Sequence, residues 1–272
     1  MFEKIKISPL QLLILLLFLS ALLLVFFLPH SKSNQKPIVN VSTIDTTLSI
    51  NIQIYTQEDS DIKNILNRFE KKEITLDSLI KYLSKKGKAP LAAYFEEIKY
   101  LSSPSDTVWF YVGKNYYQSL GFISQPSEAE AIIASAARCF NRALSLNEKN
   151  INARIMLASC YVQTQNPMLG VQMLKEIEKT DSNNVLLQMQ MAEFSIRSNQ
   201  LDKAIQRYQK ALQLDSNKTE IYAYLSEIYL QKKDTLQSIQ FLRKFAAKIS
   251  DTTLKNSINQ YISSIQKNQN IH

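Results

Sequence analysis

Glycine, proline and histidine are scarce in this sequence of 272 residues, which contains only 4, 7 and 2 of them. Tight turns and phosphate-binding loops depend on glycine, so the composition disfavours all-β folds and nucleotide-binding α/β folds. His30 directly follows a long apolar run and His272 is the last residue. Neither is expected in a packed catalytic site, which disfavours Ser–His, Cys–His and His–metal chemistry. We therefore expect a protein that is not an enzyme and that has no catalytic residues, cofactor or metal.

Only two cysteines are present, Cys139 and Cys160, which is too few for a structural zinc site on their own. The helical repeat described below predicts that they lie on neighbouring helices. Two interpretations stay open at this point. They are two small buried apolar side chains, or they form a disulfide in an oxidising compartment.

A dense cluster of one charge sign is also missing. The sequence has 32 basic and 24 acidic residues, a net charge of +8. Lysine and arginine mostly alternate with acidic residues along the expected helices, which is typical of a solvated face. Nucleic-acid binding usually requires a tighter basic stripe, so no nucleic-acid partner is expected.

One long hydrophobic run is present, at residues 10–28 after a short tail of residues 1–9. It reads LQLLILLLFLSALLLVFFL and contains no charged side chain. A helix of ~19 residues is about 28 Å long, close to the ~30 Å core of a bilayer. We predict a single transmembrane helix here. A cleaved signal peptide is the alternative, but its apolar core is usually shorter and is followed by a small-x-small site, which PHSKSNQ lacks.

Positive charges flank this run on both sides, with Lys4 and Lys6 before it and Lys32 and Lys36 after it. The positive-inside bias is therefore weak. A short tail most simply stays in the cytoplasm. We expect a single-pass protein of a bacterial inner membrane with its body in the periplasm, and the opposite topology stays open.

A linker is predicted at residues 29–59, because its first part is rich in Ser, Asn, Thr, Lys and Pro. Within it, apolar residues alternate with polar ones from Leu48 to Ile54, which is a strand pattern. The segment either lies extended against the first helices or pairs with a partner. Residues 60–105 then show helical periodicity, with Thr75 as an expected N-cap, and predict helical hairpins that form a degenerate repeat in one interpretation.

The strongest pattern is a repeat every 34 residues. Small residues recur at two positions of the repeat and large ones at a third. Small side chains let two helices approach closely, and large ones fill the space between repeats. The small positions are Ala158, Ala192 and Ser226, and Gly170, Ala204 and Ser238; the large ones are Leu174, Tyr208 and Leu242; an earlier copy has Ala136, Phe140 and Ala143.

The segment Trp109-x2-Val112-Gly113-x2-Tyr116 resembles the tetratricopeptide (TPR) pattern Trp-x2-Leu-Gly-x2-Tyr. The resemblance implies an all-α fold, a TPR α-solenoid with a right-handed superhelix of hairpins. We predict repeats at residues 106–150, 151–184, 185–218 and 219–251, followed by a capping helix and tail at 252–272. The first repeat has about 11 extra residues, which we interpret as a longer loop and an extended second helix.

In TPR arrays the first helix of each repeat lines a concave groove, so the resemblance also implies a set of partner-binding positions. The family's Lys-Asn-Arg clamp for a terminal carboxylate has no counterpart here. A groove of this composition suits an amphipathic helix or an extended apolar segment of a protein partner. The implied groove residues are Phe110, Lys114, Tyr117, Ile155, Ser159, Val162, Met189, Glu193, Ile196, Ala223, Glu227 and Leu230.

The expected function is that of a membrane-anchored scaffold or assembly factor, similar in architecture to TPR proteins of the bacterial envelope. One alternative is a receptor or adaptor that faces the cytosol. Another is a structural, oligomerising protein without a client, whose groove is filled by its own residues 38–56.

Overall fold

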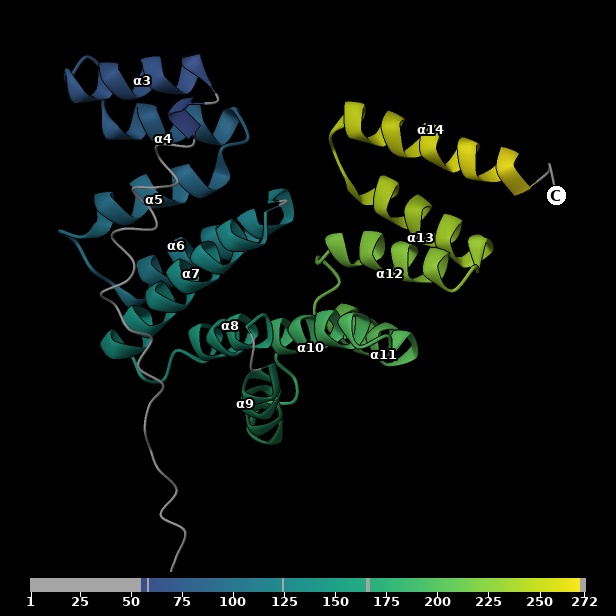
Figure 1. Cartoon of the computed structure of the whole chain (residues 1–272). Coiled ribbons are helices and arrows are strands. Elements are labelled where there is room, and N and C mark those ends of the chain that lie inside the picture. The colour runs from purple at the N-terminus through teal and green to yellow at the C-terminus, as the bar shows by residue number, and fades with distance from the viewer. Residues whose placement is uncertain (1–54, 58, 124, 165–166, 270–272) are drawn as a thin grey trace, which may run out of the picture. The chain divides into compact units, whose positions relative to one another are not determined.

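The computed structural model describes residues 55–57, 59–123, 125–164 and 167–269, and in these ranges the chain forms helices and no strand (Figure 1). The expected all-α fold is confirmed. The described helices are α3 (Ser60–Glu70), α4 (Leu76–Lys85), α5 (Ala89–Tyr100), α6 (Asp106–Ser119), the 3-10 helix η2 (Leu120–Phe122), α7 (Pro126–Leu146), α8 (Ile151–Val162), α9 (Pro167–Thr180), α10 (Val185–Arg197), α11 (Leu201–Leu214), α12 (Glu220–Gln231), α13 (Thr235–Lys248) and α14 (Thr252–Gln269).

None of the helices within these ranges is long and apolar enough to cross a bilayer. The expected transmembrane segment at residues 10–28 and the strand pattern at 48–54 both lie outside the described residues.

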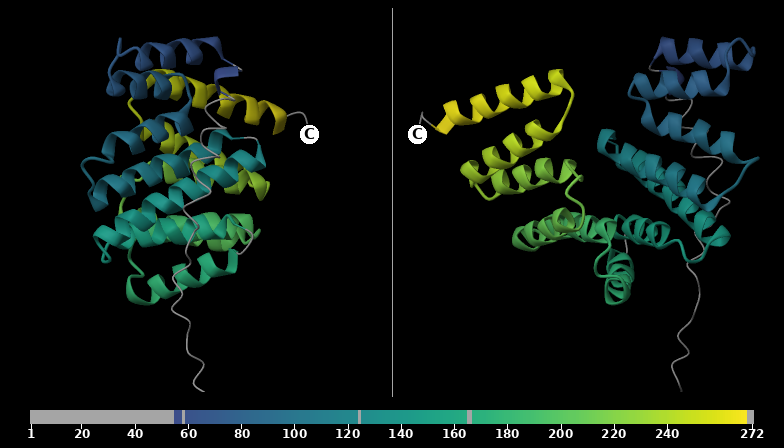
Figure 2. Two further views of the ribbon diagram at one scale, coloured as in Figure 1. Left: turned by 60° about the vertical axis from the view of Figure 1, so that its left-hand side comes forward. Right: turned by 180° about the vertical axis from the view of Figure 1, so that it is seen from behind.

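Consecutive helices pack against each other as hairpins. The most extensive contacts join α6 with α7, α8 with α9, α10 with α11, and α12 with α13. Further contacts join one hairpin to the next, for example α5 with α6 and α7 with α8 (Figures 1 and 2). The chain is therefore a helical solenoid in which each hairpin buries its apolar face against its neighbours.

The helix ends are set by polar residues at repeated positions. Thr75 caps α4 as predicted, since its hydroxyl accepts a hydrogen bond from the Ser78 amide. Asn150 and Asn184, 34 residues apart, cap α8 and α10 in the same way. The turns after α10 and α12 use Asn199 and Lys233, again 34 apart, in the left-handed region with φ of 56° and 62°. The loops therefore repeat as regularly as the helices do.

Small side chains bring the two helices of a hairpin together, as the sequence predicts. A Cβ added at Gly170 of α9 would lie 2.4 Å from the Ala158 carbonyl oxygen of α8. In the last hairpin the hydroxyls of Ser226 and Ser238 hydrogen-bond each other at 2.8 Å in the interior. Both contacts require helix axes that lie closer than bulky side chains allow.

The hairpin of α6 and α7, which forms the first predicted repeat, is longer than the later hairpins, also as predicted. α6 continues into η2, and α7 runs for 21 residues from Pro126. A buried carboxylate, Glu97 of α5, joins this hairpin to the preceding helix. It accepts hydrogen bonds from the Tyr116 hydroxyl at 3.0 Å and from Arg138 at 2.7 Å. The buried charge is thus paired and hydrogen-bonded, which is the condition under which burial is tolerated.

Cys139 and Cys160 are both free and fully buried. They lie in one apolar cluster with Phe140 and Tyr161. Burial raises the pKa of both thiols. They pack as two small apolar side chains, the first of the two interpretations of the sequence.

Gly170→Ala should destabilise the protein although alanine favours helix by about 1 kcal/mol. The added methyl group would meet backbone atoms, which cannot rotate away, so the hairpin must open. We expect a net loss of about 1–3 kcal/mol in the free energy of unfolding, measured by denaturant titration. Gly121→Ala is the matched control, since no atom lies within 4 Å of its added Cβ. Equal stabilities of the two variants would contradict the close approach of α8 and α9.

Candidate functional site

The structure places the twelve expected groove residues on four helices, with different degrees of burial. On α6 and α10 all six are half-buried, and on α8 all three are buried. On α12 two are half-buried and Glu227 is exposed. The half-buried ones are Phe110, Lys114 and Tyr117 of α6, Met189, Glu193 and Ile196 of α10, and Ala223 and Leu230 of α12.

The prediction that Ile155 of α8 lines an open groove is wrong, because this helix contacts α6, α7, α9 and α10 at once. Ile155 is fully buried in a cluster with Leu174 and Leu187, so it lies in the interior and not on an open groove. Ser159 and Val162 are also buried, but they form the floor of a small hollow. The TPR resemblance predicted the same exposed positions on the first helix of every repeat. In α8 these positions are buried because the helix contacts four neighbours.

This hollow, here called the α6–α10 hollow, brings together residues that the sequence predicts on three different helices. Tyr117, Ser159, Val162 and Glu193 all line it. Its free space is about 30 Å³, room for one or two water-sized groups. The other lining residues are Gln163, Leu174, Gln190, Phe194 and Arg197.

Polar groups in the hollow are only partly satisfied. The Gln163 amide donates a hydrogen bond of 2.8 Å to the Tyr117 hydroxyl. Gln190 is only 7 % exposed. Within the described part of the chain, Oε1 of Gln190 has no hydrogen-bond partner. A buried acceptor without a partner costs about 1–3 kcal/mol of folding free energy, so a ligand that donates a hydrogen bond to Gln190 would be stabilised in the hollow.

Glu193 dominates the electrostatics of the hollow. Burial raises the pKa of its carboxyl group to about 7, against the opposing effects of the Gln190 hydrogen bond and the Arg197 charge. Burial also raises the pKa of Tyr117, Tyr208 and Tyr224, and the negative charge of Glu193 adds to each shift. The hollow therefore contains an acid that changes its charge near neutral pH.

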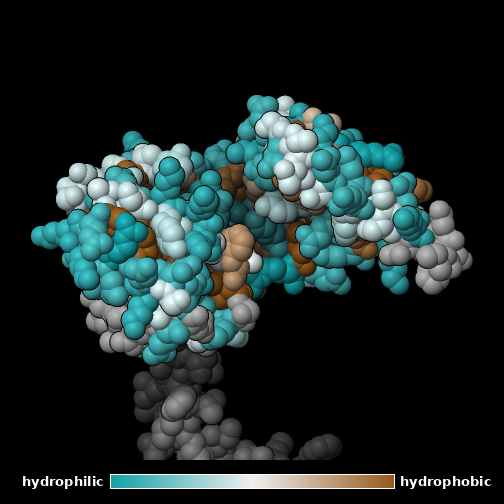
Figure 3. Space-filling view, turned by 90° about the horizontal axis from the view of Figure 1, so that it is seen from above, coloured by the Kyte–Doolittle hydropathy of each residue, from teal (hydrophilic) through white to brown (hydrophobic). Residues whose placement is uncertain are grey.

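An aromatic pair lies beside this acid. The rings of Tyr208 and Tyr224 stack with centroids 5.4 Å apart, and Tyr224 is 38 % exposed. The face of the molecule drawn in Figure 3 is mostly hydrophilic, with hydrophobic residues in small patches. Tyrosine side chains combine apolar area with a polar tip, which suits a surface that binds protein.

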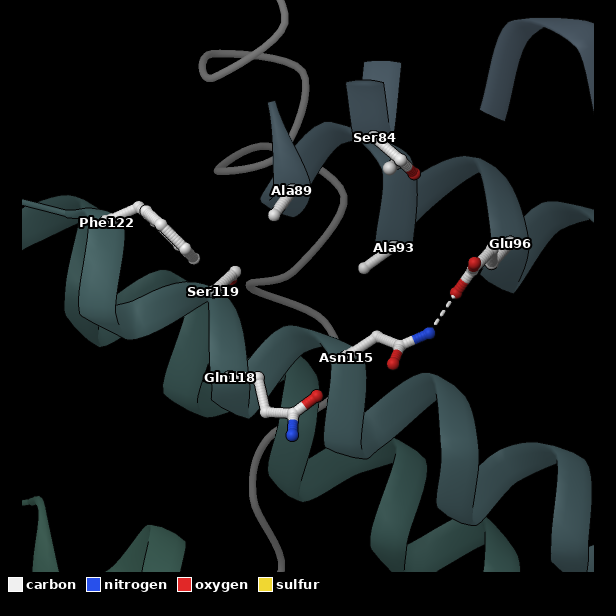
Figure 4. Close-up of a pocket in the computed structure, with 9 residues that line it drawn as sticks. Ser84, Ala89, Ala93, Glu96, Asn115, Gln118, Ser119 and Phe122 are labelled. Carbon is white, nitrogen blue, oxygen red and sulfur yellow. Dashed lines mark hydrogen bonds between the residues drawn. The ribbon is translucent and has the colours of Figure 1, made fainter. Parts of the chain in front are cut away.

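A second, larger hollow of about 280 Å³ lies between α5 and α6 (Figure 4). Its walls are largely small, with Ala89 and Ala93 opposite Ser119, and Phe122 stands at its side. Its polar groups bond each other, as Asn115 donates a 2.6 Å hydrogen bond to Glu96. No group of three His, Cys, Asp or Glu residues that could bind a metal was found in the described ranges.

Sequence reasoning missed four residues of the α6–α10 hollow, Gln163, Gln190, Phe194 and Arg197, and it expected Leu174 only in the interior. The signal was present for two of them, because positions three before and four after Glu193 share its helix face. Gln163 follows Val162 at the end of α8. Its contact with Tyr117 joins residues 46 positions apart, which no local pattern reveals.

Comparison with known proteins defines the class of fold. A family model described as TPR repeat matches residues 196–233. A thermophilic TPR protein of Thermus thermophilus is similar in structure, with a TM-score of 0.51 and 16% sequence identity over 70% of this chain and 96% of that one. The chain is therefore an all-α solenoid of the TPR type.

Two further solved structures are more distant. YrrB, described as a TPR protein with an unusual peptide-binding site, has a TM-score of 0.39 and 18% identity over 71% of this chain and 96% of its own. MamA of Desulfovibrio magneticus has a TM-score of 0.38 and 14% identity over 64% of this chain and 92% of its own. No curated protein matches the sequence.

Glu193→Gln should change how stability depends on pH. The folded state holds the proton of Glu193 more tightly than the unfolded chain, whose glutamates titrate near ~4.3. Wild type should therefore lose stability as the pH rises from that value through about 7. The variant, which has no carboxylate to bury, should be more stable than wild type at pH 8, by on the order of 1–2 kcal/mol, and close to it at pH 5.

Urea unfolding at pH 5, 6, 7 and 8 measures this difference. Glu227→Gln is the matched control, because Glu227 occupies the same position of the next repeat but is exposed. A constant difference between wild type and Glu193→Gln across these pH values would show that Glu193 is not buried as described.

Proposed function

We propose that this protein is a membrane-attached, non-catalytic scaffold that binds a segment of a protein partner along α6, α8, α10 and α12. The observation that supports this most directly is the α6–α10 hollow. Residues from four helices, α6, α8, α9 and α10, meet there around a buried acceptor that lacks a partner within the described residues. Such a site is incomplete until a ligand supplies a donor.

The class of fold supports a protein as the ligand. TPR-type solenoids present the first helices of successive hairpins side by side, as an extended surface. Here α8 contacts both α6 and α10, so the half-buried faces of α6 and α10 lie on either side of the buried α8. Half-buried Met189 and Phe194 and partly exposed Tyr224 supply apolar and aromatic area on this extended surface. This composition suits a helix or an extended segment with apolar side chains.

Attachment to a membrane is proposed from the sequence alone. Residues 10–28 are long and apolar enough to span a bilayer as a helix, with no charged side chain among them. With a short cytoplasmic tail before this span, the solenoid would lie in the periplasm of a bacterium.

Photo-crosslinking from the surface of the full-length protein tests the binding function. Benzoylphenylalanine in place of Tyr224 should give a distinct crosslinked species in cells, at least severalfold stronger than from the exposed control position Gln209 on α11. Mass spectrometry then identifies the captured segment. Equal labelling from both positions would contradict a partner-binding surface. A crosslink to residues 38–56 of the same chain would instead support a groove that the protein fills itself.

Membrane attachment is tested by extraction of isolated membranes with alkaline carbonate. The full-length protein should stay in the pellet, and a variant lacking residues 10–28 should move to the supernatant. Protease treatment of sealed inner-membrane vesicles then reports the topology, because a periplasmic solenoid is protected inside them. Release of the full-length protein by carbonate would contradict an integral anchor.

A further inference from the structure

We propose that the α6–α10 hollow is a specificity site that accepts the ammonium group of a lysine side chain from the bound partner. The inference rests on the proposed function, since it names the chemistry of the segment that the surface binds. It depends on the acceptors, the charge and the size of the hollow.

The acceptors come first. Two oxygen-bearing side chains of α10 line the hollow: Gln190, which is buried, and Glu193, which is half-buried. Oε1 of Gln190 has no hydrogen-bond partner among the described residues. An ammonium group carries three donors and no acceptor, so it could bond both side chains at once. A hydroxyl group brings only one donor.

The charge favours a cation. The negative charge of Glu193 acts on Tyr117 of α6, Tyr208 of α11 and Tyr224 of α12, none of which carries a positive charge. The only cationic group that acts on it in the described structure is Arg197 of its own helix, which is exposed at the edge of the hollow. The two side chains are not among the ion pairs within 4 Å in the described residues, so the carboxylate keeps room for a second cation. A cation that enters the hollow would gain a charge-assisted hydrogen bond away from water.

The size of the hollow distinguishes lysine from arginine. Its free space of about 30 Å³ admits one or two water-sized groups. An ammonium group is compact and sits at the end of a thin methylene chain. A guanidinium is planar and carries five donors in a rigid fork, which requires a wider site. Val162, Leu174 and Phe194 give the hollow apolar walls against which the lysine methylenes can pack.

The same position of the next repeat provides an internal control. Glu227 lies 34 residues after Glu193 on α12, but it is exposed. A cation near it competes with water and salt, so an exposed ion pair there contributes little. If the acidic surface attracted cations without specificity, both Glu193 and Glu227 would contribute to binding. A specific site in the hollow requires Glu193 alone.

Nuclear magnetic resonance of the ¹⁵N-labelled full-length protein tests this inference directly. The probes are Nα-acetyl-lysine methylamide and, as an uncharged analogue of similar length, Nα-acetyl-norleucine methylamide. The lysine probe should produce a saturable shift of the Gln190 side-chain amide signal, which is assigned by its loss in Gln190→Leu. Its affinity should rise roughly tenfold from pH 6 to pH 8 as Glu193 ionises near pH 7.

Two variants give the decisive comparison. Glu193→Gln should weaken binding of the lysine probe about tenfold or more at pH 8 and remove the pH dependence. Glu227→Gln should leave both unchanged. Equal binding of the norleucine probe, equal effects of the two variants, or no shift of Gln190 would each overturn the inference. The outcome is separate from that of the crosslinking test, because a partner captured at Tyr224 without any preference for the lysine probe leaves the proposed function standing.

Discussion

The close approach of the two helices of each hairpin is the constraint on which the rest of the structure depends. In α8 and α9 this approach occurs at Gly170, where even a methyl group would collide with the backbone of the partner helix. In α12 and α13 it occurs at Ser226 and Ser238, which share a buried hydrogen bond. When the two helices of a hairpin lie this close, large side chains such as Tyr208 fit only in the space between one hairpin and the next. Those side chains join one repeat to the next into a continuous interior.

The hollow follows from the same packing. Because α8 is covered by four other helices, its side chains Ser159 and Val162 are buried at the bottom of the hollow, and residues of the neighbouring helices form the rest of its lining. Tyr117 of α6 and Glu193 of α10 both line it, and the surrounding helices leave each of them half-buried. Burying a carboxylate costs free energy unless it is paired. Glu97 shows the paired case, with Arg138 beside it, while Glu193 shows the unpaired one. Because an unpaired carboxylate such as Glu193 does not stabilise the fold, its presence is better explained by a role in binding a ligand.

Much of the fold could be predicted from the sequence, because the information is local and repeated. Small residues at a spacing of 34 predicted which helices pair, and Thr75 predicted where a helix begins. The extra residues of the first repeat were correctly interpreted as a loop and a longer second helix. These features depend on a residue's position in its own helix, which periodicity reports.

Less of the site could be predicted, because its features depend on contacts between distant residues. Ile155 was expected on a surface and is buried, since the sequence does not reveal that α8 is covered on several sides. Glu97 meets Arg138 across 41 positions, and no spacing rule indicates this pair. Glu193 was expected in the groove from family position alone. Its unusual environment arises from helices α6, α8 and α11 together, and only the assembled structure shows it.

The titration of Glu193 is the most direct test of this account, because the hollow has its proposed properties only if that carboxyl group is shielded from water. Carbon-detected nuclear magnetic resonance of the full-length protein, with the side-chain carboxyl labelled, follows this group from pH 4 to pH 9. The account predicts a midpoint at about 7, assigned by its absence in Glu193→Gln. A midpoint at the ordinary glutamate value of about 4.3 would show that the group is solvated and would contradict the site.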